Sequence, residues 1–177
     1  MLLLAAAGCG TVRINTGLDP TAHFDSYHTF NFQRPAAEKQ TPGFTPEVQE
    51  LVEIAIQREF EVREIIPSAQ PDLLVGFYLS VQEKKFDLQN PTSGQHSVSG
   101  VMADYFGFTY RSGQDLNHMG EIPYEEGTLV IDVADARTGR LVWQGLAKGV
   151  LYRDETPDQI KHRVNEAVRK MFDHYPR

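Results

Sequence analysis

Two apolar segments near the C-terminus constrain the fold most, because their side chains alternate with the period of β-strands. Segments 128–133 and 141–152 each place apolar residues at every second position. Between them, Gly139 can take the positive φ that a tight turn requires. The pattern therefore predicts an antiparallel hairpin. Its expected core-facing residues are Leu129, Ile131 and Val133 on one strand and Leu141 and Trp143 on the other.

Three other segments also have the character of strands. The run 73–81 is almost continuously apolar, as is typical of a strand in the middle of a sheet. Segment 24–32 alternates aromatic and polar residues and predicts a half-buried strand. A shorter alternation at Val12 and Ile14 predicts a brief first strand. The face expected for segment 24–32 consists of His28, Phe30 and Phe32.

Two amphipathic helices have recognisable first turns. Thr45 can cap a helix over 46–60 that has proline at its first position. Thr156 and Gln159 form a capping box at the start of a helix over 157–173. With the strands, these helices predict an α+β fold of two layers. We expect a mixed, mostly antiparallel sheet of four to six strands with both helices packed on one face.

The N-terminus ends its apolar stretch on the single cysteine of the chain. Residues 1–8 are apolar or small and precede Cys9 directly. This order resembles a lipobox, in which the chain is cut before a cysteine whose sulfur carries a diacylglyceryl group. We therefore predict a residual signal peptide at 1–8, a lipidated N-terminus and tether at 9–22, and one domain at 23–177 with a long loop at 87–123. The alternative is a frayed terminus with a free or buried Cys9.

Lipidation would fix the location of the protein. Acyl chains on Cys9, palmitate included, would hold it on a membrane without a spanning helix. Gly10, rather than aspartate, follows the cysteine, which favours the outer membrane and a position facing the periplasm. The expected partners are the membrane itself and an envelope protein or lipid.

Charge and composition exclude several other functions. The net charge is −7 and the 17 basic residues are scattered, which argues against nucleic acid as a partner. One cysteine cannot form an intramolecular disulfide or a site that needs several thiolates. The six histidines lack metal-binding spacing, and no catalytic or nucleotide-binding motif is present. The sequence therefore predicts no metal, no cofactor and no catalytic residues.

Three aspartates and one tryptophan could be taken for site residues. Asp72 and Asp135 adjoin predicted turns, where a carboxylate accepts backbone N–H bonds, so turn and cap roles are favoured over catalysis. Asp132 lies in the middle of a strand, and we expect it to face solvent or pair with Lys148. Trp143 is expected to be a packing residue rather than a ligand platform.

The long predicted loop contains the best candidate for an interaction surface. Its aromatic residues alternate with glycine and could supply contact area to a partner at low entropic cost. The alternative is an additional hairpin that packs on the protein's own sheet. The candidate residues are Tyr105, Phe106, Phe108 and Tyr110.

Three segments together resemble the DUF4136 family of bacterial lipoproteins. They are FDSYHTF at 24–30, PDLLV at 71–75, and the hairpin sequence EGTLVIDV at 126–133 followed by LVWQG at 141–145. The resemblance covers nearly the whole chain after Cys9. It implies a lipid-anchored envelope protein with a small α+β domain, and it assigns no catalytic residues.

Two functional hypotheses follow. The first is a non-enzymatic envelope accessory or binding module that is tethered by Cys9 and contacts its partner through the loop 87–123. The second is an envelope hydrolase or lipid-handling enzyme whose polar groups converge only in three dimensions. The residues that would have to converge are His96, Asp104, Asp115, His118 and Glu121.

Overall fold

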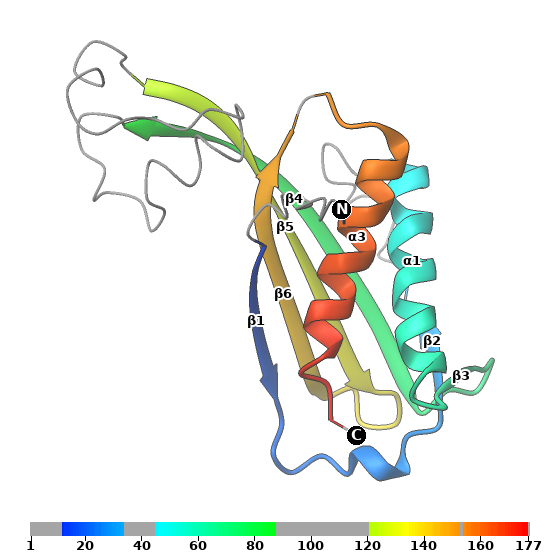
Figure 1. Ribbon diagram of the computed structural model, residues 1–177. Coiled ribbons are helices and arrows are strands. Elements are labelled where there is room, and N and C mark those ends of the chain that lie inside the picture. Colours follow the sequence, from blue (N-terminus) through cyan, green and yellow to red (C-terminus); the bar gives the residue numbers. More distant parts are fainter. Residues whose placement is uncertain (1–11, 34–44, 88–120, 153, 177) are drawn as a thin grey trace, which may run out of the picture.

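The computed structural model describes residues 12–33, 45–87, 121–152 and 154–176, which form one sheet and a helical layer (Figure 1). The six strands lie in the order β1-β6-β5-β4-β2-β3. β2 runs parallel to β4 and β3, whereas β4, β5, β6 and β1 are successively antiparallel. The predicted two-layer α+β fold is confirmed. The strands are β1 (Arg13–Leu18), β2 (Thr29–Phe32), β3 (Ile66–Pro67), β4 (Leu73–Asp87), β5 (Glu121–Asp135) and β6 (Leu141–Leu151).

Both α-helices begin at the caps that the sequence predicts. α1 (Pro46–Glu61) starts after Thr45, whose side chain accepts a hydrogen bond from the Val48 N–H. α3 (Pro157–Phe172) starts with a complete capping box between Thr156 and Gln159. In the described part of the chain, no helix has the length and apolarity needed to cross a bilayer.

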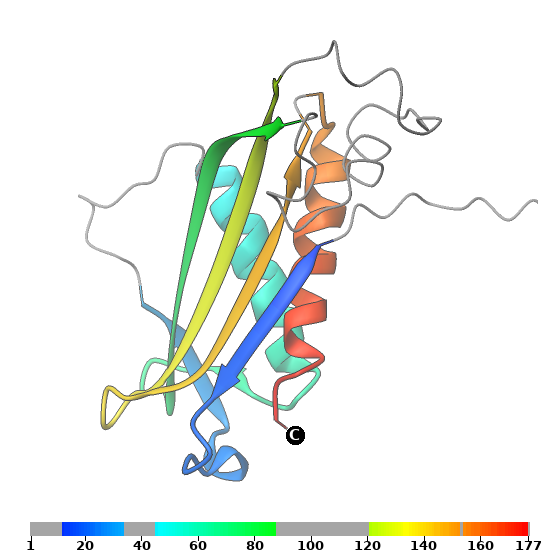
Figure 2. The same ribbon diagram turned by 90° about the vertical axis from the view of Figure 1, so that its left-hand side faces the viewer.

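The helices lie side by side on one face of the sheet, and no other described element covers the opposite face, which we call the open face (Figures 1 and 2). The core lies between the two layers. Leu73, Val75, Ile131 and Val133 on the central strands are fully buried, as predicted for the centre of the sheet. The helices contribute Val52, Ala55, Ile56 and Phe60 from α1 and Ala167, Val168, Met171 and Phe172 from α3.

β4 and β5 are the longest strands, and they continue beyond the helical layer (Figure 1). Their ladder runs without interruption from Leu73 opposite Asp135 to Asp87 opposite Glu121. We call residues 82–87 and 121–126 the arm. The predicted loop 87–123 therefore includes strand residues at both ends, because β4 ends at Asp87 and β5 begins at Glu121. The polar residues after Val81 lack the alternation of a half-buried strand, since this part of the ribbon is not built on the core.

Segment 24–32 is a strand only in its second half. Residues Phe24–Ser26 form a 3-10 turn, η1, in which the Tyr27 N–H donates to the Phe24 carbonyl. The turn brings the Phe24 ring edge-on against Tyr175, with ring centroids 5.6 Å apart. The predicted alternation holds from Thr29 onward, where Phe30 is buried and Asn31 is exposed.

The prediction that Leu141 and Trp143 share a core-facing side was wrong. Trp143 pairs with Val133 and is buried, but Leu141 pairs with Ala134 and is 48% exposed. The register shifts between these two pairs, so an extra residue interrupts the alternation. The bulge lies next to the turn that contains Gly139, whose φ is +69° as predicted.

β1 is part of the sheet, because it pairs with β6 along its full length from Arg13 opposite Lys148 to Leu18 opposite Trp143. The sheet therefore begins at Arg13, whereas the sequence placed the tether at 9–22 and the start of the domain at residue 23. The alternation of Val12 and Ile14 correctly indicated this strand.

Candidate functional site

Polar side chains gather at the end of the sheet opposite the arm, where carboxylates join segments that are distant in sequence. Asp72 lies just before β4, and its Oδ2 accepts the backbone N–H groups of His28 and Thr29, each at 3.0 Å. The Thr29 hydroxyl donates to the same oxygen at 2.8 Å. The bond from the His28 N–H and then those from Thr29 lower the pKa of Asp72. Asp72 thus joins the start of β2 to the start of β4. It accepts backbone N–H groups as predicted, but from residues 43 and 44 positions away and not from its own turn.

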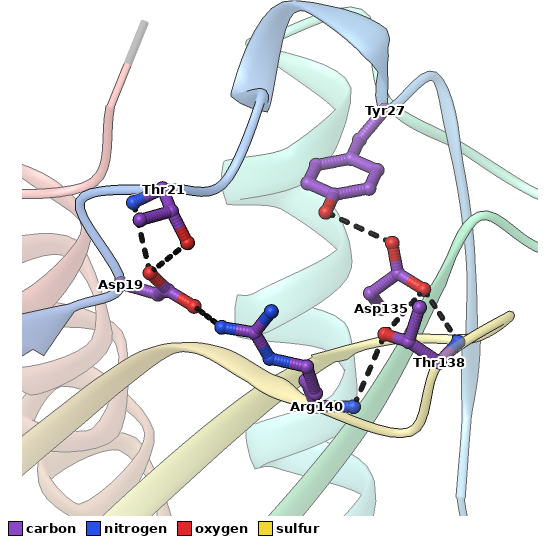
Figure 3. Close-up of polar contacts among 6 residues, drawn as sticks. All are labelled: Asp19, Thr21, Tyr27, Asp135, Thr138 and Arg140. Carbon is purple, nitrogen blue, oxygen red and sulfur yellow. Dashed lines mark hydrogen bonds and ion pairs between the residues drawn. The ribbon is translucent and has the colours of Figure 1, made fainter.

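Asp135 closes the turn between β5 and β6. Its Oδ1 accepts the backbone N–H of Thr138 at 2.7 Å and the Thr138 hydroxyl at 2.9 Å. Its Oδ2 accepts the Tyr27 hydroxyl at 3.1 Å, which ties the turn to the segment after η1 (Figure 3). The bond from the Thr138 N–H is the main reason that the pKa of Asp135 is lowered, whereas burial and the bond to Asp135 raise the pKa of Tyr27. The predicted turn role of Asp135 is confirmed.

Asp19, which follows β1, also joins its own turn to a distant segment through hydrogen bonds to its carboxylate. Its Oδ1 accepts the N–H and hydroxyl of Thr21 at 2.8 and 2.6 Å, and Oδ2 binds the Arg140 guanidinium at 2.6 Å. The bonds from Thr21 lower the pKa of Asp19. This aspartate was not among the residues predicted from the sequence. The Asp-Pro-Thr sequence at 19–21 is a turn signal that could have identified it, but nothing local indicates the link to Arg140. We call Asp19, Thr21, Tyr27, Asp135, Thr138 and Arg140 the basal cluster (Figure 3).

The basal cluster has the chemistry of a structural network, in which hydrogen bonds hold distant segments of the chain together. The Asp19 and Asp135 carboxylates accept hydrogen bonds from the chain itself and stay ionised because their pKa values are lowered. Tyr27 stays protonated because its pKa is raised. A general acid or base for catalysis needs a pKa near the working pH, and these shifts run in the opposite direction.

Trp143 is a packing residue, as predicted, because it is 1% exposed and lies between aromatic rings. Its centroid is 5.1 Å from Phe172 and 5.3 Å from Tyr175. Gly145, two residues further along β6, leaves room for the indole, because a Cβ there would lie 2.5 Å from Trp143 Cη2. Tyr175, which was not predicted from the sequence, follows the end of α3 and packs edge-on against Phe60 in the same aromatic cluster.

A groove of about 380 Å³ is lined by residues from α1, the residue after it, and α3. This volume is at the small end of the range for ligand sites. Its walls carry acidic and basic side chains side by side, so it has no single charge with which to select a ligand. The lining residues are Ala55, Arg58, Glu59, Val62, His162, Asn165, Glu166 and Arg169.

The open face of the sheet carries cross-strand polar pairs. The Gln144 amide donates to Asp132 at 2.7 Å, so Asp132 pairs with its register partner, whereas Lys148 lies opposite Thr128. Within the arm, Lys84 binds Glu126 at 2.6 Å. Tyr78, on this face, is 51% exposed.

Several predicted site residues lie outside the described residues, namely Cys9, the aromatic residues Tyr105, Phe106, Phe108 and Tyr110, and the alternative set His96, Asp104, Asp115 and His118. Glu121 is placed by its backbone in β5. Within the described ranges, no three His, Cys, Asp or Glu side chains are grouped closely enough to hold a metal ion.

Structural comparison relates this fold to solved proteins at low sequence identity. A PDZ domain protein from Parabacteroides distasonis superposes with a TM-score of 0.53 at 15% identity, over 94% of this chain and 36% of that one. This chain thus spans little more than a third of that protein, and the likeness concerns the fold alone. PelC from Paraburkholderia phytofirmans, crystallised as a dodecamer, gives a TM-score of 0.48 at 8% identity over 91% of this chain and 94% of that one.

Sequence comparison gives the family. No curated protein matches the chain. The model of a domain family of unknown function matches residues 14–177, which include all of β1 except Arg13 and every later described element to the end of α3. The resemblance seen in the three sequence segments is thereby confirmed. The chain belongs to the DUF4136 family.

Proposed function

We propose that the protein is a lipid-anchored, non-enzymatic binding module of the bacterial envelope. It is held on the outer membrane through Cys9 and faces the periplasm. The observation that carries this proposal is the short distance in sequence between Cys9 and the fold, because β1 begins at Arg13.

That spacing restricts how the domain can stand on a membrane. Four residues of extended chain reach at most about 14 Å, so a lipid on Cys9 keeps the Arg13 end of β1 near the bilayer surface. Arg13 pairs with Lys148, and Lys148 pairs with Thr128 on β5, so this is the end of the sheet from which the arm projects (Figure 1). The basal cluster lies at the opposite end of the strands, away from the membrane.

A binding role is favoured over catalysis by the use that the chain makes of its carboxylates. Asp19, Asp72 and Asp135 accept hydrogen bonds from residues of the chain, and their pKa values are lowered. In this proposal the partner, an envelope protein or lipid, is contacted by residues between the two strands of the arm, where the sequence places the aromatic candidates. The membrane-proximal arm would present them close to the bilayer surface.

The anchor is tested by intact-mass and peptide analysis of the protein from its native envelope fraction. We expect an N-terminal peptide that begins at Cys9 and carries a diacylglyceryl group and an amide-linked acyl chain. Cys9→Ser should release the protein into the soluble fraction with an unchanged thermal melt. An unmodified peptide that still contains Gly8 and Cys9 would refute the anchor.

The binding role is tested separately by replacing residues 88–120 with a short Gly-Ser linker while keeping Cys9. We expect the envelope partner captured by cross-linking to the wild type to be lost and the unfolding midpoint to stay unchanged. A matched variant with Tyr105, Phe106, Phe108 and Tyr110 all changed to Ser should lose the partner as well. Retention of the partner by both variants would refute this surface.

A further inference from the structure

The two edges of the sheet differ in how well they are protected against pairing with another strand. The β3 edge has two residues, one of which is Pro67. The β1 edge has six residues without proline, from Arg13 to Leu18, and no strand in the described part of the chain pairs with its outer side. A long edge strand of this kind is a template for another strand.

The direction of the backbone groups along β1 follows from one hydrogen bond. The Asp19 N–H donates to the Val142 carbonyl on the β6 side, at 2.9 Å. Because successive residues of a strand direct their N–H and C=O groups to alternate sides, Asp19 and the odd-numbered residues face β6. Ile14, Thr16 and Leu18 therefore direct their backbone donors and acceptors toward the outer edge.

The side chains of β1 complement a second β1 in one symmetric register. Antiparallel pairing centred on Thr16 sets each Thr16 against its own copy and each Ile14 against Leu18 of the partner subunit. It covers Leu18, which is 51% exposed. It also brings Arg13 opposite the partner's Asp19, a pair of opposite charges at both ends of the contact. Apolar, threonine and opposite-charge pairs are the cross-strand neighbours that stabilise a sheet.

We propose that the outer edge of β1 is a docking surface for a second copy of this chain. Two copies then join around a two-fold axis at Thr16 and form one sheet that runs through both subunits. The three outward-facing residues of each strand supply the backbone hydrogen bonds. The proposal does not depend on lipidation or on the binding role proposed above. Because the two β1 strands run in opposite directions, the two Arg13 ends lie at opposite ends of the pair, so this dimer is an alternative to the upright arrangement on a membrane and not an addition to it.

Proline substitution separates backbone pairing from other contacts. Because the Thr16 N–H faces outward, Thr16→Pro removes a donor of the docking edge without removing one from the β1–β6 ladder. Thr16→Val is the matched control, since it keeps the N–H and suits a strand.

Sedimentation velocity of the full chain with Cys9→Ser should show a dimer with a dissociation constant on the order of 10–100 μM. T16V should keep the dimer, and T16P should be monomeric with a wild-type circular dichroism spectrum. A monomeric parent chain at about 300 μM, or a dimer that survives T16P, would overturn the proposal.

Cysteine cross-linking tests the register, and it remains informative if T16P fails to fold. In the Cys9→Ser background, T16C should form a disulfide dimer under mild oxidation, because the register sets each position 16 opposite its copy. N15C is the control, since its copy lies on the diagonal, beyond the reach of a disulfide. Cross-linking of N15C in preference to T16C, or of neither, would contradict the register.

The charge pair provides a third readout. Arg13→Glu sets like charges against the partner's Asp19 and should weaken the dimer by about tenfold or more. Dimerisation of the unsubstituted strand should also weaken with added salt. An R13E chain that dimerises as well as the parent would overturn the proposed register.

Discussion

The two ends of the β4–β5 ribbon are built differently. At the basal end, Asp72 and Asp135 bind segments far away in sequence, and the helices cover the strands. In the arm, β6 ends at Leu151 opposite Glu125, so residues 121–124 of β5 pair with β4 alone. A ribbon of two strands is only marginally stable by itself, whereas strands that pack on a core are stable. One pair of strands thus provides both a stable base and a projecting segment whose stability is set locally.

From this contrast we expect the side-chain hydrogen bonds at the base to make that end of the sheet the more stable one. Carboxylates that accept several N–H and O–H groups are concentrated at the base, next to the aromatic cluster around Trp143. The arm has the Lys84–Glu126 ion pair at 2.6 Å, in which the lysine side chain is 38% exposed and the glutamate side chain 10%. Because the lysine is in contact with solvent, we expect this pair to stabilise the arm less than the several hydrogen bonds stabilise the base.

Native-state hydrogen exchange should show the contrast most strongly. Amides of Val75 and Val133 should open only with global unfolding, whereas those of Lys84 and Tyr124, which pair across the arm, should open locally. We expect protection to differ by about a thousandfold, or about 4 kcal/mol. Equal protection along the ribbon would mean that the arm belongs to the same cooperative unit as the base.

Removal of the basal aromatic packing should have the next largest effect. Trp143→Ala leaves a large cavity beside Phe172 and should lower the free energy of unfolding by about 3–5 kcal/mol. Tyr78→Ala, on the open face, is the control and should cost about 1 kcal/mol or less. Urea unfolding of both variants measures the difference, and similar losses would show that the two faces of the sheet contribute alike.

Loss of one carboxylate that joins distant segments should lower the free energy of unfolding by less than loss of Trp143. Asp72→Ala removes the acceptor for three donors on His28 and Thr29 and should cost about 1–2 kcal/mol, because Asp72 is partly exposed and water satisfies some of these groups. Asp72→Asn keeps an acceptor oxygen and should cost less than Asp72→Ala. The same urea experiment checks this, and equal costs would show that the charge rather than the hydrogen bonding matters.

Lowering the pH should destabilise the basal end of the sheet gradually. The folded-state pKa values of Asp72 and Asp135 lie below the ordinary value of 3.8, so their stabilisation is complete above the unfolded-state pKa. It declines as the pH falls through about 4 and is lost below the folded-state pKa values. The double variant Asp72→Asn, Asp135→Asn should flatten the decline of stability with falling pH in this range. An unchanged pH profile would show that other carboxylates control acid unfolding.

Local chemistry explains why parts of this structure could be predicted from the sequence. The helix starts at Thr45 and Thr156 are visible because each cap acts within three residues of itself. Asp135 was assigned to a turn for the same reason, since Thr138 is three residues away. The alternation of Leu129, Ile131 and Val133 is equally local and was confirmed by their burial.

The errors and omissions arise where distant contacts decide the structure. The bonds from Asp19 to Arg140 and from Tyr27 to Asp135 join residues 121 and 108 positions apart. The bulge that exposes Leu141 and the turn that removes Phe24 from its strand serve packing against other elements, so no local pattern indicates them. The continuation of β4 beyond Val81 was missed because its polar residues pair with an equally polar partner strand.

The position of β1 at the sheet edge also determines how the molecule would resist mechanical load. The chain enters the sheet at the Arg13 end of β1, whereas its C-terminus lies near the other end of that strand (Figures 1 and 2). A pull between the two termini therefore acts along the strand and perpendicular to the hydrogen bonds that join β1 to β6. These bonds would be loaded together in shear instead of opening one after another. The first strand is thus placed to transmit tension from the N-terminus to the whole sheet without peeling away.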